Sequence, residues 1–540
     1  MREQEKKGLV LAGLLVGMLV AALDQTIVDT AFPRMIAELH GEDQFTWVIT
    51  AYLLASTAVV PVVGKLADIY GRKIFYLIGM GLFVGSSMLC GAAESMLQLI
   101  LFRALQGIGG GMVMPVVFTI VGDLFPGEAR ARMQGLFGGV FGVASVLGPK
   151  LGGWITHHFS WRWIFYINLP LGLIAMAFMF LFYRESRGER RPVDWLGALT
   201  VMASVVLFLL AMAQGGEAWA WDSWQSITLF GGSALFLILF LAVERRVPEP
   251  VLDPSLFRNR TFAVMQAVGL LMGAGMFMAV IFIPWFIQGV VGYNPNQAGN
   301  VMTPMMLSMV VASVLGGRAA LRFTYRQQLS AGFLILLAGF FTMTRWTPHT
   351  TALQATVSSM ILGAGLGLIM PITTLAVQNA FPAHRRGVVT SATAFFRQIG
   401  GTVGSTLGGA IFNHQMAARF QERLAGQVAR LQEAGAALPP QAAAFFREAA
   451  ADPQMLVRLL LSSEAQAAIP AAFREPLLAG VKAMMVDSLH VVFYTGIALV
   501  FAGLVAVQLL GSVSLREQTR TAQAGAAGDA PKLGAPPAVH

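Results

Sequence analysis

Residues 107–115, G-I-G-G-G-M-V-M-P, decide how this chain is organised, because they return as G-A-G-L-G-L-I-M-P at residues 363–371. A Phe-Pro pair follows each copy at the same distance. Glycines and a leucine between residues 148 and 153 also recur between 404 and 409, again 256 residues later. The pattern predicts two parallel repeats, and duplicated helical halves that enclose a site at their interface are typical of membrane transporters.

The composition indicates a chain that lies in lipid. Of its 540 residues, 56% are hydrophobic and 12% are charged, and the mean hydropathy is +0.65. A soluble domain carries about 25% charged residues. The single cysteine, Cys90, excludes a disulfide framework and a cysteine-based metal site. The charged residues 1–7 lead into a long apolar stretch without a small-residue cleavage site, which predicts a retained first helix.

Apolar stretches of about 20 residues are long enough to span a membrane. The sequence contains fourteen of them, at residues 9–32, 45–65, 74–93, 96–121, 134–156, 163–183, 194–213, 226–243, 262–290, 298–318, 328–345, 353–377, 389–412 and 489–511. We therefore predict an all-α membrane protein with fourteen transmembrane helices. Because this number is even, both termini are expected on the same side.

The basic residues test this topology. If the N-terminal side is called inside, the inside segments hold 24 of the 37 lysines and arginines, and the short outside loops hold Arg34, Arg162 and Arg345. Cytoplasmic loops carry such an excess. The basic net charge therefore reflects topology and not nucleic-acid binding, and both termini are expected in the cytoplasm, with the chain in an inner or plasma membrane.

The repeat register pairs the fourth and fifth predicted helices with the twelfth and thirteenth. Two helices are then inserted between six-helix bundles. The expected domains are an N-terminal bundle at 9–183, a linker with the inserted helices at 184–261, a C-terminal bundle at 262–511, and a disordered inside tail at 512–540. The second bundle includes a long outside segment, 413–488, whose role as gate, lipid contact or docking site stays open.

Residues 64–73, G-K-L-A-D-I-Y-G-R-K, join the second and third predicted helices on the inside. This segment resembles the signature loop of the major facilitator superfamily. The resemblance implies an inside gate that attaches to the start of the helix predicted at 389–412. Its members would be Gly64, Asp68, Gly71, Arg72 and, as a second acidic partner, Asp123. The corresponding segment of the second half has Leu321 in place of the acid, so we expect a one-sided latch. A solvated turn is the alternative.

Two charged positions within predicted spans point to proton coupling. Residues 23–33, L-D-Q-T-I-V-D-T-A-F-P, resemble the first-helix signature of the fourteen-helix branch, drug:proton antiporter family 2. The resemblance implies that Asp24 binds protons and cations. Asp29, where that family usually has Asn, is a second candidate, although it is expected to cap the helix or face water. Residues 101–109, which contain Arg103, resemble the proton-coupling signature of the family's fourth helix. Alternatively, the Arg103 side chain binds backbone carbonyls and ties neighbouring helices together.

The fifth predicted helix carries a glycine-rich segment that resembles the antiporter motif. Its members are Gly148, Pro149, Lys150, Gly152 and Gly153. The resemblance implies that this helix bends and packs closely against the opposite half. Lys150 departs from the pattern, and it is expected to extend outward, to engage an acid such as Asp29, or to discourage cationic substrates. Residues 160–170, S-W-R-W-I-F-Y-I-N-L-P, are also characteristic of the branch and predict an aromatic belt at the outer interface.

A methionine-rich cavity is predicted between the halves, because flexible methionines suit promiscuous binding. The candidate lining residues are Gln25, Met276, Phe277, Trp285, Gln288, Met305 and Arg397.

The resemblance implies a proton-coupled antiporter that exports lipophilic, cationic drugs. A dedicated exporter of an endogenous amphiphile, such as a lipid, siderophore or secondary metabolite, is the alternative. The sequence contains no phosphate-binding loop, so the proton gradient is the expected energy source and no cofactor or metal is expected. No catalytic constellation argues for an enzyme. The expected partners are the substrate, protons and lipid, for a monomer; an outer accessory partner stays open.

Overall fold

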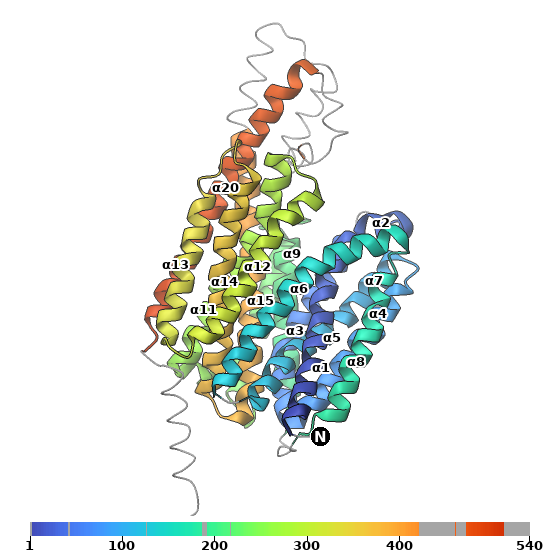
Figure 1. Ribbon diagram of the computed structural model, residues 1–540, viewed down its shortest axis with the longest axis vertical. Coiled ribbons are helices and arrows are strands. Elements are labelled where there is room, and N and C mark those ends of the chain that lie inside the picture. The colour runs from blue at the N-terminus through green and yellow to red at the C-terminus, as the bar shows by residue number, and fades with distance from the viewer. Residues whose placement is uncertain are drawn as a thin grey trace, which may run out of the picture.

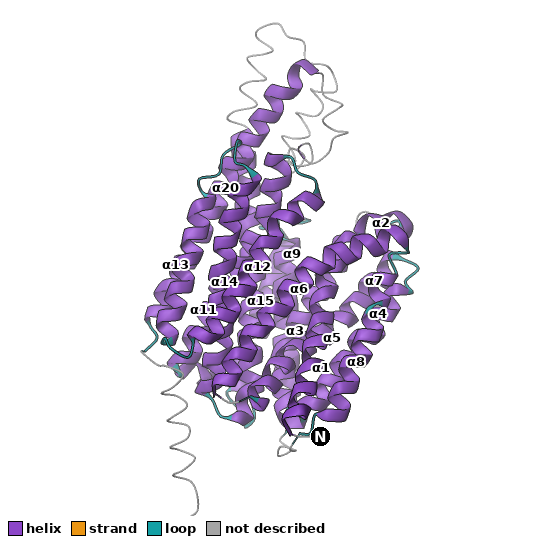
Figure 2. Cartoon of the chain, viewed as in Figure 1, coloured by secondary structure: helices purple, strands orange, loops and turns teal. Residues whose placement is uncertain are grey.

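The chain is helical wherever its structure is described. A computed structural model describes residues 3–41, 44–125, 127–185, 192–216, 218–420, 460 and 471–511. These residues form helices joined by loops, with a single isolated bridge between Gly215 and Trp219 and no strand (Figure 2). The predicted all-α fold is confirmed. Most of segment 413–488 and the tail at 512–540 lie outside the described residues.

The helices follow the predicted order. The first half contains α1 (Glu3–Ile27), η1 (Val28–Thr30), α2 (Phe32–Leu39), α3 (Thr46–Tyr70), α4 (Arg72–Gly91), α5 (Met96–Leu124), α6 (Gly127–His158), α7 (Trp163–Tyr166) and α8 (Asn168–Phe182). Two further helices follow, α9 (Trp195–Gln214) and α10 (Trp224–Glu244). The second half contains η2 (Pro254–Arg258), α11 (Arg260–Phe286), η3 (Ile287–Val291), α12 (Pro295–Ala319), α13 (Tyr325–Met343), α14 (Ala352–Ala380), η4 (Ala383–Arg385), α15 (Arg386–Arg419) and α20 (Ala471–Gln508).

Twelve helices in the described part of the chain are long and apolar enough to cross a membrane. The other two predicted spans correspond to α13 and α15, which are helical but more polar. They lie within the second half, where α15 packs against α11 and α13 packs against α14. The chain is therefore a multi-pass membrane protein. Because α13 and α15 are less apolar, their place in the bundle depends more on contacts with neighbouring helices.

The repeat extends to the helix ends. Both ends of α14 lie 256 residues after those of α5. The cap residues match as well, since Ser95 accepts a hydrogen bond from the backbone of Gln98 and Thr351 accepts one from the backbone of Gln354. A Cβ atom added at Gly107 or at its equivalent Gly363 would collide with the backbone of a neighbouring helix. The repeated glycines therefore permit close helix contact, on which association in lipid depends.

In the described part of the chain, the two halves meet on the side of the N-terminus (Figure 1). In Figure 1 they lie side by side near the N-terminus and diverge toward the end where α2 lies. Each half has its own apolar core, with Tyr76 and Phe83 fully buried in the first and Phe333 and Phe340 in the second. The inserted helix α9 packs against α3, α10 and α15. We call the closed end the N-terminal side.

Some predicted boundaries were wrong. The helix predicted at 489–511 begins at Ala471 in α20, and α15 continues to Arg419, so both extend beyond their apolar stretches. The helix predicted at 163–183 is divided into α7 and α8. The predicted aromatic belt also divides, because Trp163 is exposed whereas Trp161 is buried and donates a hydrogen bond of 2.6 Å to Glu38.

Candidate functional site

A buried ion pair joins α1 to α5 in the first half. Nη1 of Arg103 lies 2.6 Å from Oδ2 of Asp24, and the two residues are 2% and 0% exposed. A charged side chain inside a membrane-spanning helix is tolerated where it has a partner. The structure thus brings these two predicted residues into direct contact.

Two amide side chains complete the surroundings of Asp24. Gln106 Nε2 and Asn168 Nδ2 donate to Oδ1 of this carboxylate at 2.9 and 3.0 Å. Both amides also donate to Ser87 Oγ on α4, at 3.1 and 2.9 Å. Helices α1, α4, α5 and α8 therefore converge on one carboxylate. The sequence analysis missed these three polar residues; the spacing of Gln106, one turn after Arg103 on α5, was the available signal.

Aromatic rings enclose the cation. The guanidinium carbon of Arg103 lies 4.3 Å from the centre of the Tyr52 ring and 5.9 Å from that of Phe165. Its Nε donates to the carbonyl of Val48 at 3.4 Å. Cation–π contacts of this kind stabilise a desolvated arginine. The tethering role considered from the sequence accounts for only one of these contacts, and the others hold the charge beside Asp24.

The glycine-rich helix α6 packs against both halves of the protein. A Cβ atom at Gly148 or Gly152 would collide with Thr26 or Thr30, which belong to the first half's own α1 and η1. Helix α6 does pack closely against the opposite half, as expected, but not through these two glycines. That contact is made nearer the start of α6, where Gly142 lies against Val310 of α12. Of the remaining motif residues, Gly153 has open space beside it, and Pro149 is exposed.

Three predicted residues lie apart from the ion pair. Gln25, Asp29 and Lys150 are exposed, on α1, η1 and α6 respectively. Within the described ranges, neither Asp29 nor Lys150 has an ion-pair partner, so the expected engagement between them is absent. The structure thus distinguishes Asp24, which is enclosed, from Asp29, which is exposed.

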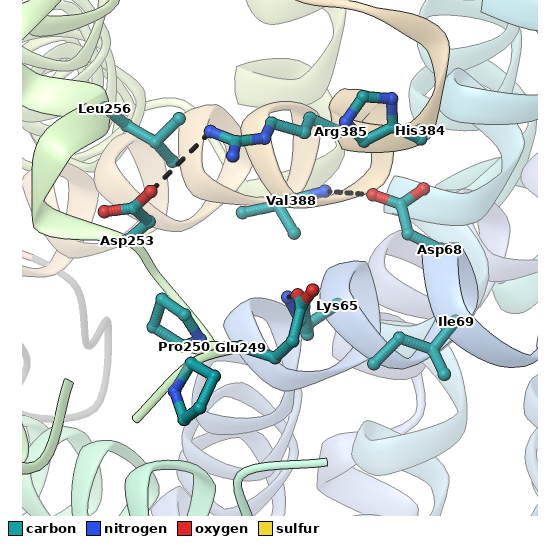
Figure 3. A pocket seen from close by; sticks show the side chains of 11 residues that line it. Lys65, Asp68, Ile69, Glu249, Pro250, Asp253, Leu256, His384, Arg385 and Val388 are labelled. Atoms are coloured by element: carbon teal, nitrogen blue, oxygen red, sulfur yellow. Dashed lines mark hydrogen bonds and ion pairs between the residues drawn. The ribbon is translucent and has the colours of Figure 1, made fainter. Parts of the chain in front are cut away.

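Asp68, at the end of α3, attaches the first half to the second on the N-terminal side. Its Oδ1 accepts a hydrogen bond of 3.1 Å from the backbone N–H of Gly387, and its Oδ2 accepts one of 3.0 Å from that of Val388 (Figure 3). These donors lie in the first turn of α15, where the helix dipole favours a negative charge. A Cβ atom at Gly64 would collide with Gly387 and Ser391, so the close approach of α3 to α15 requires this glycine.

Arg72 connects several groups of this attachment. Its Nη2 donates to Asp68 and to the carbonyl of Ala383, both at 2.9 Å, and its Nη1 is paired with Asp123. Arg386 of the second half also pairs with Asp123, at 3.1 Å. The predicted gate residues therefore form one cluster across the two halves, which we call the latch.

The turn before Arg72 is shaped by glycine and by an acid that was not predicted. Gly71 has a φ of 103°, a conformation that side chains rarely adopt. Glu185 accepts hydrogen bonds from the backbone N–H groups of Arg72 and Lys73, at 2.7 and 3.0 Å. Glu185 thus holds the start of α4 and orients the latch arginine.

The repeat equivalents of two latch residues form a second contact between the halves, which is not an ion pair. Nη1 of Arg130 donates to Oδ1 of Asn379 at 2.6 Å. These residues are the repeat equivalents of Arg386 and Asp123, which form an ion pair. Of these two contacts between the halves, one is therefore ionic and the other is not. The sequence predicted that the second half lacks an acid at Leu321. The structure shows that the second half also has the neutral Asn379 where the first half has Asp123.

The predicted cavity residues of the second half have unequal exposure. Met276, Phe277, Trp285, Gln288 and Arg397 are half-buried. Met305 departs from the prediction, because it is fully buried in the apolar core. No acidic side chain in the described segments pairs with Arg397. The half-buried residues stay candidates for the cavity lining, whereas Met305 packs in the apolar core.

Similar proteins include characterised transporters. The sequence model of the Major Facilitator Superfamily matches residues 14–405. The multidrug transporter protein MdtP of Bacillus subtilis (strain 168) is 42% identical over 519 residues, which cover 95% of this chain and 94% of that protein. Multidrug resistance protein 3 of the same organism is 40% identical over 425 residues, covering 78% of this chain and 83% of that protein.

A solved structure shares the fold. The human organic anion transporter MFSD10 (TETRAN) superposes with a TM-score of 0.55 at 14% sequence identity, covering 93% of this chain and 100% of that chain. This likeness concerns the fold alone. The sequence match, the repeated halves and the latch between them lead to the same assignment: the chain belongs to the Major Facilitator Superfamily.

Proposed function

We propose that the chain exports lipophilic compounds, including cationic drugs, across the cytoplasmic membrane in exchange for protons. The main support is the buried pair of Asp24 and Arg103, because a carboxylate and a cation inside spans mark a functional site by default. The names of the two Bacillus relatives support multidrug efflux. Both termini lie in the cytoplasm in this proposal, so the latch closes the cytoplasmic side.

Exchange follows from breaking and remaking the buried ion pair. With the latch closed, the halves diverge toward the outside, where substrate leaves and a proton enters. The proton neutralises Asp24 and releases Arg103 from it, which loosens α1 from α5. Opening of the latch then exposes the site to the cytoplasm, where substrate binding accompanies release of the proton. The proton gradient supplies the free energy, no cofactor takes part, and the chain works as a monomer in lipid.

A dedicated exporter of an endogenous amphiphile is the second candidate, and Lys150 favours it. This lysine is exposed on α6 and has no ion-pair partner among the residues described. A positive charge on the outward path repels cations and attracts an anionic head group. Both candidates use the same proton-driven cycle and differ only in the substrate.

Proton release from vesicles tests the function directly. Everted vesicles that contain the protein and hold an acidic interior should release protons when a cationic dye is added outside. The rate should increase with the amount of protein, and vesicles without the protein serve as the control. Dye accumulation that persists unchanged after the proton gradient is collapsed would show that export is not proton-coupled.

A Lys150→Gln variant should transport cations better relative to anions. Removing an exposed positive charge is expected to change the ratio of apparent affinities for a cationic and an anionic dye by about threefold, because solvent screens such charges. The measurement is dye uptake into everted vesicles at low salt. Arg345→Gln, which also removes an exposed basic residue, is the matched control and should leave the ratio unchanged. Equal ratios in both variants would exclude Lys150 from substrate selection.

A further inference from the structure

Two carboxylates are buried at the ends of the inserted helices. Asp194 caps α9 and Glu244 ends α10, and they are 6% and 3% exposed. Oδ1 of Asp194 accepts a hydrogen bond of 2.8 Å from the backbone of Gly197. Its Oδ2 is buried without a hydrogen-bond partner. A buried acceptor that lacks a donor is costly, so this oxygen points to a missing hydrogen.

The unpartnered oxygen and an oxygen of Glu244 lie beside the same glycine. A Cβ atom added at Gly197 would contact Oδ2 of Asp194 and Oε1 of Glu244 at the same time, so both oxygens lie beside one point. In the described part of the chain, no basic side chain forms an ion pair with either residue. Two neighbouring carboxylates in a buried site do not both remain ionised.

We propose that Asp194 and Glu244 form a proton-binding site, in which one shared proton lies between Oδ2 of Asp194 and Oε1 of Glu244. With the proton on Oε1 of Glu244, the unpartnered oxygen of Asp194 gains a hydrogen-bond donor. The described residues contain no group of three or more ligating side chains that could hold a metal. The site is separate from Asp24 and does not depend on the proposed function.

The surrounding charges do not replace the proton. Lys65 of α3 is a cation that acts on Glu244, and its Nζ is paired with Glu249 at 2.7 Å. Glu249 lies on the connector between α10 and η2. Arg245 follows Glu244 in the chain but is exposed. Among the described residues, no cation therefore takes the place of a proton shared by the two buried carboxylates.

In this proposal the shared proton stabilises Glu244, and Glu244 in turn binds the connector between α10 and η2, which contacts both halves near the latch. The oxygens of Glu244 accept hydrogen bonds from the backbone N–H groups of Val251 and Leu252, at 3.0 and 3.3 Å. The same connector reaches Lys65 of α3 through Glu249, and Arg385 beside α15 through Asp253, at 3.6 Å.

A pocket of about 290 Å³ lies beside this connector. Figure 3 shows Lys65 next to Glu249 of the connector, and Asp68 next to Val388, among the residues that line it. The proton site thus anchors a segment that contacts both halves on the N-terminal side.

Infrared spectroscopy of the full chain in lipid vesicles tests the proposal. At about pH 7, where ordinary carboxyl groups are ionised, the wild type should show the carbonyl band of a protonated carboxyl group. Asp194→Asn and Glu244→Gln should each lose it. Asp222→Asn, at an exposed position, and Asp24→Asn should keep it, which separates this site from the transport site. A band that persists in both test variants, or that is absent from the wild type, overturns the proposal.

Thermal unfolding gives a second readout. The folded protein would hold a proton that the unfolded chain releases, so the wild-type midpoint should fall as pH rises from about pH 5 to about pH 8. Asp194→Asn should flatten this dependence; if it does not fold, Glu244→Gln takes its place. An unchanged slope in the folded variant contradicts a shared proton. So does a wild-type midpoint that rises with sodium concentration at constant ionic strength, since it indicates a bound cation.

Discussion

An Asp24→Asn variant should insert into the membrane and lose proton-coupled export. Asparagine keeps an oxygen that accepts from Gln106 and Asn168, but it cannot be ionised and leaves Arg103 buried beside a neutral group. Breaking a buried pair in this way costs about 3–5 kcal/mol. Because no proton can be exchanged at this position, we expect the rate of dye-driven proton release to fall about a hundredfold, which corresponds to about 2.7 kcal/mol.

The controls separate coupling from stability. Asp29→Asn makes the same substitution at an exposed residue close by, and it should retain a rate within about twofold of the wild type. The double variant Asp24→Asn with Arg103→Gln removes both charges, so it should recover thermal stability without recovering proton release. If Asp24→Asn exchanged protons for dye at the normal rate, Asp24 would have no part in the mechanism.

The repeat was predictable because short sequence patterns recur at a fixed offset along the chain. Glycines and prolines at fixed offsets mark helix contacts, and helices α5 and α14 accordingly begin and end in the same register. A charge in an apolar span is equally conspicuous, which is why Asp24 and Arg103 could be selected. Their contact at 2.6 Å could not be predicted, because it depends on how α1 and α5 pack.

Neutral polar residues were missed because nothing in the sequence sets them apart. Gln106, Ser87 and Asn168 lie on three different helices, and each is compatible with ordinary packing in a membrane bundle. Only the convergence of these helices identifies Gln106 and Asn168 as hydrogen-bond donors to Asp24 and Ser87 as an acceptor from both amides. Asp194 and Glu244 were missed for the same reason, since 50 residues of sequence separate two side chains that meet at Gly197.

The glycines of the antiporter motif do not by themselves determine which helix they contact. Glycines indicate that a helix approaches a neighbour closely, but not which neighbour. Helix α6 uses one part, at Gly148, against α1 of its own half, and another part, at Gly142, against α12 of the opposite half. The sequence therefore predicted the close packing of this helix against the opposite half, but not the contact of Gly148 with α1.

A Gly64→Val variant should fail to close the N-terminal side and should lose transport. Even a single Cβ atom at this position would collide with the backbone carbonyl of Gly387 and the side chain of Ser391. Overpacking of this kind costs about 1–3 kcal/mol, and the cost applies only while α3 and α15 are in contact. The closed latch would therefore lose about 5- to 150-fold in population relative to the open state.

Distances between spin labels measure this shift. Labels at Tyr70, which is exposed at the end of α3, and at Arg385, which is exposed beside α15, report the separation of the halves at the latch. Because Cys90 is buried, introduced cysteines can be labelled selectively. Gly64→Val should lengthen the main distance and reduce dye export in parallel, whereas Gly85→Val, where a side chain meets nothing within 4 Å, should change neither. A wild-type distance distribution in Gly64→Val would mean that α3 and α15 can close without this glycine, and the latch would not control access.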